Sequence, residues 1–164
     1  MTSTMDDIYD AYGTFEELKL LTAAIERWDI NSIDHLPEYM KHFYVALLDV
    51  YKEIEEEMEK EGNQYRVRHR SSRTFCIDFM KNLVRAYFHE AKWFHEGSIP
   101  TMEEYMRIAL VTSGYYMLTT MSFIGMGEIV TKEAFDGVIS DPKIITASAV
   151  ICRLMDDISS YKVL

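Results

Sequence analysis

Residues 14–28, TFEELKLLTAAIERW, contain the signals that decide the fold of this chain. Thr14 and Glu17 have the spacing of a capping box, in which two side chains satisfy free backbone N–H groups at the start of a helix. After this start, apolar side chains recur every three or four residues, at Phe15, Leu18, Leu21, Ile25 and Trp28. The segment therefore predicts an amphipathic helix with one face buried in a core.

The same signals recur along the rest of the chain. Proline and glycine positions together with apolar stripes predict helices over residues 37–62 and about 78–95, and a very apolar helix after Thr101. A last helix is expected to begin at Asp141-Pro142. No segment shows sustained alternation of apolar and polar residues, so no strand is expected. The sequence predicts an all-α fold.

Composition excludes several classes of function. The 164 residues are 48% hydrophobic, which suits one domain with a real core. They include 17 Lys and Arg against 27 Asp and Glu, a formal charge of −10 that disfavours binding to nucleic acid or an anionic membrane. Cys76 and Cys152 are far apart and predict neither a disulfide scaffold nor a cysteine zinc site. With no signal peptide evident in residues 1–10, the cytoplasm is the expected compartment.

Three segments have an unusual composition. The acidic run 53–61 is interpreted as a solvated helix face, and the basic run 66–73 as a mobile loop rather than a phosphate site. Residues 108–126 carry no formal charge, so a membrane span has to be considered. Hydroxyl groups and a glycine inside this stretch, and flanks without an anchoring pattern, favour a buried central helix.

Three aspartates near the start, Asp6, Asp7 and Asp10, form the first cluster that could carry chemistry. On a helix, Asp6 and Asp10 lie one turn apart on the same face. Carboxylates this close repel one another unless a cation lies between them, so the cluster suggests a metal site. The alternative is an acidic first turn that complements the helix dipole.

A second cluster follows the nearly apolar segment 144–152. Asp156 and Ser160 are four residues apart and share a helix face, and Arg153 precedes Asp156 by one turn. The planar guanidinium of Arg153 is suited to grip a phosphate group. Charges on a buried helix are costly without partners, so either a ligand or a structural Arg–Asp pair must satisfy them.

The candidate ligands in both clusters are hard oxygen atoms. This chemistry suits Mg²⁺ or Mn²⁺ and argues against zinc and copper. Because Mg²⁺ commonly bridges protein carboxylates to substrate phosphates, a diphosphate substrate is the resulting hypothesis.

The string MDDIYDAYGT at residues 5–14 resembles the aspartate-rich DDxxD motif of plant class I terpene synthases. RWD at 27–29, LPEYMK at 36–41 and ICRLMDD at 151–157 are similar to the same family, in the same order and over nearly the whole chain. The sesquiterpene synthases of the germacrene or cadinene type are the most similar members. The resemblance implies an α-helical terpenoid-synthase bundle, three Mg²⁺ ions, and ionisation of an allylic prenyl diphosphate, usually farnesyl diphosphate, followed by cyclisation of the carbocation.

The resemblance implies roles for the residues of this chain that match the family's motifs. The metal ligands implied are Asp6, Asp7, Asp10, Asp156 and Ser160. The substrate-binding residues implied are Arg153, which would donate to the diphosphate, and Thr112 and Ser113, which fall where the family breaks a central helix beside the active site.

The chain also departs from the family pattern. Leu164 stands where the second metal motif has Glu, and leucine cannot coordinate a cation. The arginine motif upstream of DDxxD, the N-terminal domain and the last helices of the family are not in this sequence, and residues 66–75 depart from the helix start expected there. We therefore expect residues 1–164 to be a partial metal-binding domain, an incomplete bundle with impaired activity.

Two other functions stay open at this point. One is a catalytically dead helical module that only associates with other chains, or with itself, through exposed apolar faces. The other is a chain-elongating prenyl transferase, which would predict a second DDxxD motif where this chain has DDISS at 156–160.

Overall fold

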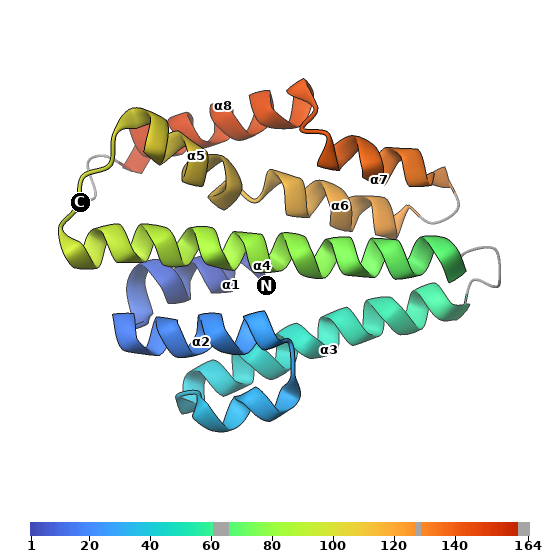
Figure 1. Ribbon diagram of the computed structural model, residues 1–164, viewed down its shortest axis with the longest axis horizontal. Helices are drawn as coiled ribbons and strands as arrows, with labels where there is room; N and C mark the ends of the chain where they lie inside the picture. The colour runs from blue at the N-terminus through green and yellow to red at the C-terminus, as the bar shows by residue number, and fades with distance from the viewer. Residues whose placement is uncertain (61–65, 127–128, 161–164) are drawn as a thin grey trace.

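The computed structural model describes residues 1–60, 66–126 and 129–160, and each element within these ranges is a helix, which confirms the all-α prediction. Figure 1 shows the arrangement. The elements are α1 (Thr2–Asp7), the π-helical turn η1 (Ile8–Tyr12), α2 (Phe15–Arg27), the 3₁₀ helix η2 (Ile30–His35), α3 (Glu38–Lys60), α4 (Arg66–Glu96), α5 (Met102–Thr112), α6 (Tyr115–Gly125), α7 (Lys132–Ile139) and α8 (Lys143–Ser160).

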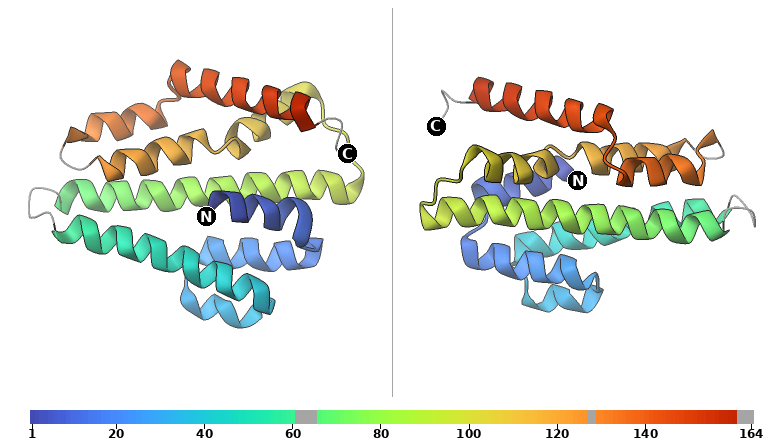
Figure 2. Two further views of the ribbon diagram at one scale, coloured as in Figure 1. Left: turned by 180° about the vertical axis from the view of Figure 1, so that it is seen from behind. Right: turned by 45° about the horizontal axis from the view of Figure 1, so that its top comes forward.

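The long helix α4 runs through the middle of the molecule and separates two groups of helices (Figures 1 and 2). The turn η1 and helices α2 and α3 pack on one side of α4, and α1 leads into η1. Helices α5 and α6 pack on the other side and carry α7 and α8 outside them. η1 and the C-terminal end of α8 both lie toward the C-terminal end of α4 (Figure 2). Segments from the two ends of the sequence therefore come to the same end of the bundle.

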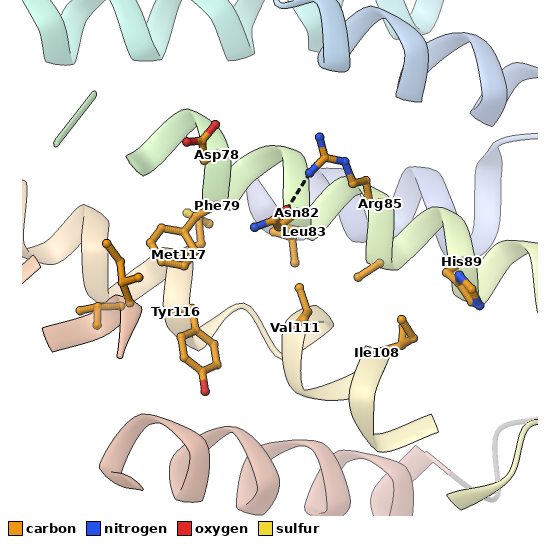
Figure 3. A pocket seen from close by; sticks show the side chains of 13 residues that line it. Asp78, Phe79, Asn82, Leu83, Arg85, His89, Ile108, Val111, Tyr116 and Met117 are labelled. Carbon is orange, nitrogen blue, oxygen red and sulfur yellow. Dashed lines mark hydrogen bonds between the residues drawn. The ribbon is translucent and has the colours of Figure 1, made fainter. Parts of the chain in front are cut away.

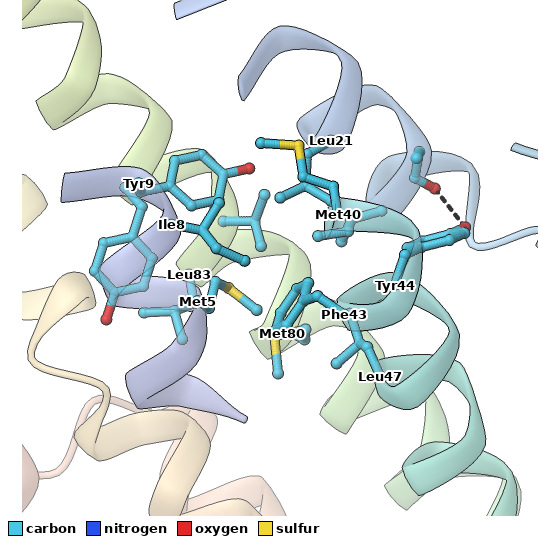
Figure 4. Close-up of a cluster of buried hydrophobic side chains, with 14 of the residues drawn as sticks. Met5, Ile8, Tyr9, Leu21, Met40, Phe43, Tyr44, Leu47, Met80 and Leu83 are labelled. Atoms are coloured by element: carbon cyan, nitrogen blue, oxygen red, sulfur yellow. Dashed lines mark hydrogen bonds between the residues drawn. The ribbon is translucent and has the colours of Figure 1, made fainter. Parts of the chain in front are cut away.

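The hydrophobic core fills the space between α1, α2, α3 and α4 (Figure 4). Its fully buried side chains include Met5, Leu21, Met40, Leu47 and Met80. Burial of each such side chain contributes about 1.5–3 kcal/mol relative to exposure. Tyr44 is also fully buried, and its hydroxyl donates to the carbonyl oxygens of Ala24 and Asp29, each at 2.9 Å. This satisfied polar group ties the end of α2 to α3.

Of the helix starts that the sequence predicted, those of α2, α3, α5 and α8 agree with the structure and that of α4 does not. The Thr14–Glu17 and Thr101–Glu104 capping boxes both form, with each backbone N–H bonded by its partner's side chain. The prediction of a mobile loop at residues 66–73 is wrong, because the backbone of this basic run forms the first turns of α4. No glycine or proline occurs between residues 66 and 96, so nothing in the sequence breaks the helix.

The uncharged stretch predicted as one buried helix is two helices. α5 ends at Thr112, Gly114 adopts a left-handed conformation with φ 74°, and α6 begins at Tyr115. Within the described residues, one stretch, Met102–Gly125, is long and apolar enough to be considered for a membrane span, a criterion that core helices of globular proteins also meet. Both halves pack on α4. The break falls at the position that the resemblance implied.

Candidate metal and diphosphate site

The first aspartate cluster spans the end of an α-helix and a π-helical turn, rather than the single regular α-helix expected from the sequence. Asp6 and Asp7 end α1, and Asp10 lies in η1. The Gly13 N–H donates to the carbonyl oxygen of Ile8 at 2.8 Å and closes the turn. A Cβ atom at Gly13 would lie 2.8 Å from that oxygen and 2.5 Å from Cδ2 of Leu18, so the turn requires glycine. π-helical turns occur frequently at functional sites.

Asp6 and Asp10 carry negative charge in unfavourable surroundings. Asp6 is half-buried, and loss of hydration raises its pKa, against the effects of a hydrogen bond from Tyr87 and of the positive charge of Arg153. Loss of hydration is the larger cause that raises the pKa of Asp10, and the negative charge of Asp6 is the next. A bound cation would relieve both effects. Asp7 is exposed beside them.

Helix α4 contributes a carboxylate that the sequence reasoning missed. Glu90 is half-buried, and burial raises its pKa to about 7. Asp6 and Asp10 raise this pKa further, while Thr112 and Arg153 lower it. Glu90 could have been found from the sequence, because it continues the buried stripe of Leu83 and Tyr87 at helical spacing and is its one charged member.

The break between α5 and α6 lies next to this carboxylate. The Thr112 hydroxyl donates to Oε1 of Glu90 at 2.9 Å, and the carbonyl oxygen of Thr112 lies 3.3 Å from the Tyr87 hydroxyl oxygen. Ser113 instead donates locally, to the carbonyl oxygen of Leu110 at 2.7 Å. Of the two residues that the resemblance implied here, Thr112 contacts the carboxylate of Glu90, whereas the Ser113 hydroxyl bonds within its own turn.

Helix α8 presents the second cluster. Nη2 of Arg153 lies 2.9 Å from Oδ1 of Asp157 and 4.0 Å from Oδ2 of Asp156. The structural Arg–Asp pair left open by the sequence is therefore present, and Asp157 is the partner. Asp156 and Ser160 are exposed, and the Ser160 hydroxyl donates to the carbonyl oxygen of Asp156 at 2.8 Å. Lone pairs of both side-chain groups remain available to a ligand.

The two clusters lie close enough to affect each other electrostatically. The charges of Arg153 and Asp156 shift the pKa of both Asp6 and Asp10, in opposite directions. Within the part of the chain that the structure describes, no three Asp, Glu, His or Cys side chains are grouped tightly enough to hold a metal ion alone. Within these residues the carboxylates therefore form no closed cage. Leu164 lies outside the described residues.

Two cavities differ in their relation to these residues. One of about 580 Å³ lies along α8 and is lined by Asp156 together with Tyr115 and Cys152. A larger one, of about 670 Å³, lies where α4 faces α5 and α6 (Figure 3). Its lining, which includes Phe79 and Ile108, contains none of the predicted site residues. We assign the smaller cavity to the site because it includes a member of the second cluster.

Comparison with known proteins identifies the class to which this fold and these clusters belong. Residues 1–163 match the family described as "Terpene synthase family, metal binding domain". The chain belongs to this family. This match favours a terpene synthase over the prenyl transferase alternative.

Individual relatives sharpen the comparison. The chain is 69% identical to valencene synthase and 61% identical to (-)-germacrene D synthase, both from Vitis vinifera, over 162 residues in each case. These matches cover 99% of this chain and 28% of each relative, so the chain spans less than a third of their length. The fold is similar to that of isoprene synthase from grey poplar (Populus x canescens) in complex with three Mg²⁺ ions and dimethylallyl-S-thiolodiphosphate. The TM-score is 0.82 at 32% identity, over 96% of this chain and 29% of that one.

Proposed function

We propose that this chain supplies the metal- and diphosphate-binding part of a sesquiterpene synthase that ionises farnesyl diphosphate and cyclises the resulting carbocation. The observation that carries the proposal is that Arg153 and Asp156 on α8 lie near enough to Asp6 and Asp10 to shift the pKa values of both aspartates. Acidic and basic groups from opposite ends of the sequence meet at one end of the bundle, as a shared ligand requires.

The residues present fit Mg²⁺. Asp6 and Asp10 offer oxygen ligands whose pKa values are raised by lost hydration and by neighbouring carboxylates, and a divalent cation relieves that repulsion. Together with Glu90 they would provide Mg²⁺ ligands from the first cluster, and Asp156 with Ser160 would provide Mg²⁺ ligands from α8. Mg²⁺ keeps water and phosphate ligands, so it does not require a closed protein cage. When bound, the metal would neutralise charge on the diphosphate as it leaves.

The chain's own groups would bind and orient the substrate. Arg153 would donate to the diphosphate, and its positive charge already lowers the pKa of Asp6, Asp10 and Glu90. The cavity along α8, with Tyr115, Ile151 and Met155 in its lining, would take the apolar carbon chain. The name of a 62% identical relative, sesquiterpene synthase 2 from Toona sinensis, supports a substrate of sesquiterpene length. Cys76 and Cys152 are both free, which supports a location in the reducing cytoplasm.

Isothermal titration calorimetry tests this function on the 164-residue chain. The chain is titrated with inorganic diphosphate in the presence and absence of Mg²⁺, alongside Asp6→Asn and Asp156→Asn. We expect diphosphate binding that depends on Mg²⁺ and is lost in both variants, because each removes a ligand from one side of the site. Asp34→Asn, which changes an exposed carboxylate on η2, is the control and should bind as the wild type does. Binding without metal, or binding that survives both substitutions, would contradict the proposal.

A second candidate function is association with other chains. Four apolar side chains of α8 are largely exposed, namely Ile144 (76%), Ile151 (64%), Met155 (62%) and Ile158 (72%). An exposed apolar face of this kind commonly marks an interaction surface. Light scattering during gel filtration would reveal self-association of the chain, and Ile144→Ser with Ile158→Ser should reduce it. A monomer at all concentrations would remove this candidate.

A further inference from the structure

Tyr105 closes a ring of hydrogen bonds around Arg153 and Asp157. It lies on α5, which packs against α8, the helix that carries the other two residues. Its hydroxyl donates to Oδ2 of Asp157 at 2.6 Å and accepts from Nε of Arg153 at 2.9 Å. Oδ1 of Asp157 accepts from Nε of Arg153 at 3.0 Å and lies 2.9 Å from Nη2. Each member of the ring therefore contacts both of the others.

This ring fixes one edge of the guanidinium and leaves the other outside it. The bonds use Nε and Nη2 of Arg153, and Nη1 takes no part in them. A free arginine side chain populates many rotamers, so ordering it when a ligand binds lowers affinity. Because Tyr105 is on a different helix from Arg153, the ring sets the position of the guanidinium relative to the bundle and not only relative to α8.

The ring also keeps Arg153 from binding the neighbouring metal-site carboxylate. Asp156 is one turn from Arg153 and exposed, yet its Oδ2 atom stays 4.0 Å from Nη2, beyond hydrogen-bond distance. Asp157 takes the charge-assisted bonds in its place. Asp156 thus remains available to a ligand while the positive charge stays near Asp6, Asp10 and Glu90, whose pKa values it lowers.

We propose that Tyr105 and Asp157 are positioning residues, which hold the Arg153 guanidinium in the orientation that receives the diphosphate group. This inference rests on the proposed function, because it assigns the two residues to the same site. Their role is exerted through Arg153, and neither is assigned a contact with the substrate. Residues that hydrogen-bond a ligand-binding side chain hold it in the binding orientation before the ligand arrives.

The test uses the 164-residue chain with Tyr105→Phe, which removes only the hydroxyl group. Tyr116→Phe is the matched control, because the Tyr116 hydroxyl, on α6, also donates to a carboxylate, that of Asp141. We measure the affinity for inorganic diphosphate in Mg²⁺ by calorimetry, the thermal unfolding midpoint, and the Arg153 Nε–H signal by ¹⁵N NMR. A purely structural tyrosine would change the midpoint but would not change the Nε–H signal and diphosphate affinity together.

Tyr105→Phe should weaken diphosphate binding about tenfold, as expected for loss of a hydrogen bond to a charged group. It should also broaden the Arg153 Nε–H signal by exposing it to exchange with water. Tyr116→Phe should leave both unchanged. Asp157→Asn removes the charge partner of Arg153 and should weaken binding by a larger factor, so it provides a second test if Tyr105→Phe does not fold. Affinity within twofold of the wild type in either folded variant would overturn the inference.

The result separates this inference from the proposed function. If the wild type binds diphosphate, Asp6→Asn abolishes binding and Tyr105→Phe does not weaken it, the metal site stands and the positioning role fails. If the wild type binds no diphosphate in Mg²⁺, both fail together.

Discussion

The Thr112 hydroxyl donates a hydrogen bond of 2.9 Å to Oε1 of Glu90, and this contact joins the break between α5 and α6 to the buried side of α4. Because α5 ends at Thr112, the last residue of α5 faces Glu90, and the Glu90 carboxylate accepts its hydrogen bond. Because Glu90 is half-buried and near Asp6 and Asp10, this one hydrogen bond does not offset the unfavourable surroundings of its charge.

Glu90 should therefore make stability depend on pH in the absence of metal. Its pKa rises from an ordinary value of 4.5 to about 7 on folding, chiefly through burial. Between these values the folded chain holds a proton that the unfolded chain has released, so the free energy of unfolding should fall as the pH rises through this window. Urea unfolding from pH 5 to pH 8 measures this slope.

Glu90→Gln should reduce the slope. The control is Glu104→Gln, because the hydrogen bonds of its capping box lower the pKa of Glu104 and move its titration below this window. If Glu90→Gln leaves the pH dependence of the unfolding free energy unchanged, Glu90 is ionised over the whole range from pH 5 to pH 8.

Gly13→Ala should destabilise the chain and disturb Asp10. The new Cβ would lie 2.5 Å from Cδ2 of Leu18 and 2.8 Å from the carbonyl oxygen of Ile8, so the π-helical turn must shift. Such overpacking costs about 1–3 kcal/mol. Gly137→Ala is the matched control in α7, where nothing lies within 4 Å of the added atom. It should stabilise the chain by about 0.5–1 kcal/mol, the usual advantage of alanine over glycine in a helix. Urea unfolding of both variants compares them, and equal effects would contradict this account of the turn.

Asp10→Asn should have opposite effects on stability and on ligand binding. In metal-free buffer it removes a charge that lost hydration and Asp6 both disfavour. Because the Asp10 side chain is exposed and water screens its charge, the free energy of unfolding should rise only slightly, by about 0.2–0.5 kcal/mol. In Mg²⁺ and inorganic diphosphate the wild type should gain stability and the variant should gain little, because a ligand is missing. Thermal unfolding with and without these ligands gives both values. A variant that is less stable without metal would mean that Asp10 has a structural role.

The two cysteines should differ in reactivity. Cys76 is buried, and burial raises its pKa to about 12, so it should not react with N-ethylmaleimide in the folded chain. Cys152 is half-buried and lines the cavity that contains Asp156, so it should react. Mg²⁺ with inorganic diphosphate should slow its labelling by occupying the site. Mass spectrometry follows each residue, and rapid labelling of Cys76 without denaturant would show that the core opens there.

Local signals in the sequence predict most of the fold. The capping boxes at Thr14 and Thr101, the proline at the start of α3 and the apolar stripes locate helices whose ends depend on nearby residues. The start of α4 at Arg66 could not be read in this way, because a polar basic run is equally compatible with a loop. The π-helical turn at residues 8–12 was not predicted either, because the four-residue spacing of Asp6 and Asp10 suits a regular α-helix.

The candidate site could be predicted in part. Spacing of four residues identified Asp6 with Asp10 and Asp156 with Ser160 as pairs, because helical periodicity is a local property. Glu90 was missed although it continues an apolar stripe at helical spacing. Tyr105 could not be predicted, because it reaches the site through a contact with Asp157, 52 residues away on α8. The sequence does not decide which group pairs with Arg153. In the structure its partner is Asp157, the neighbour of Asp156, which the four-residue spacing predicted as a ligand.

The central claim is that Asp6 and Asp10 share one metal–diphosphate site with Asp156. Paramagnetic broadening by Mn²⁺ tests it most directly, because Mn²⁺ suits the same oxygen ligands and broadens the NMR signals of nuclei near it. The ¹⁵N-labelled chain is titrated with substoichiometric Mn²⁺ in the presence of inorganic diphosphate. We predict that amide signals of residues 6–10 and 153–160 broaden together, and that Asp10→Asn reduces the broadening at both segments. Broadening confined to one segment, or spread over the acidic surface without preference for either, would contradict the shared site.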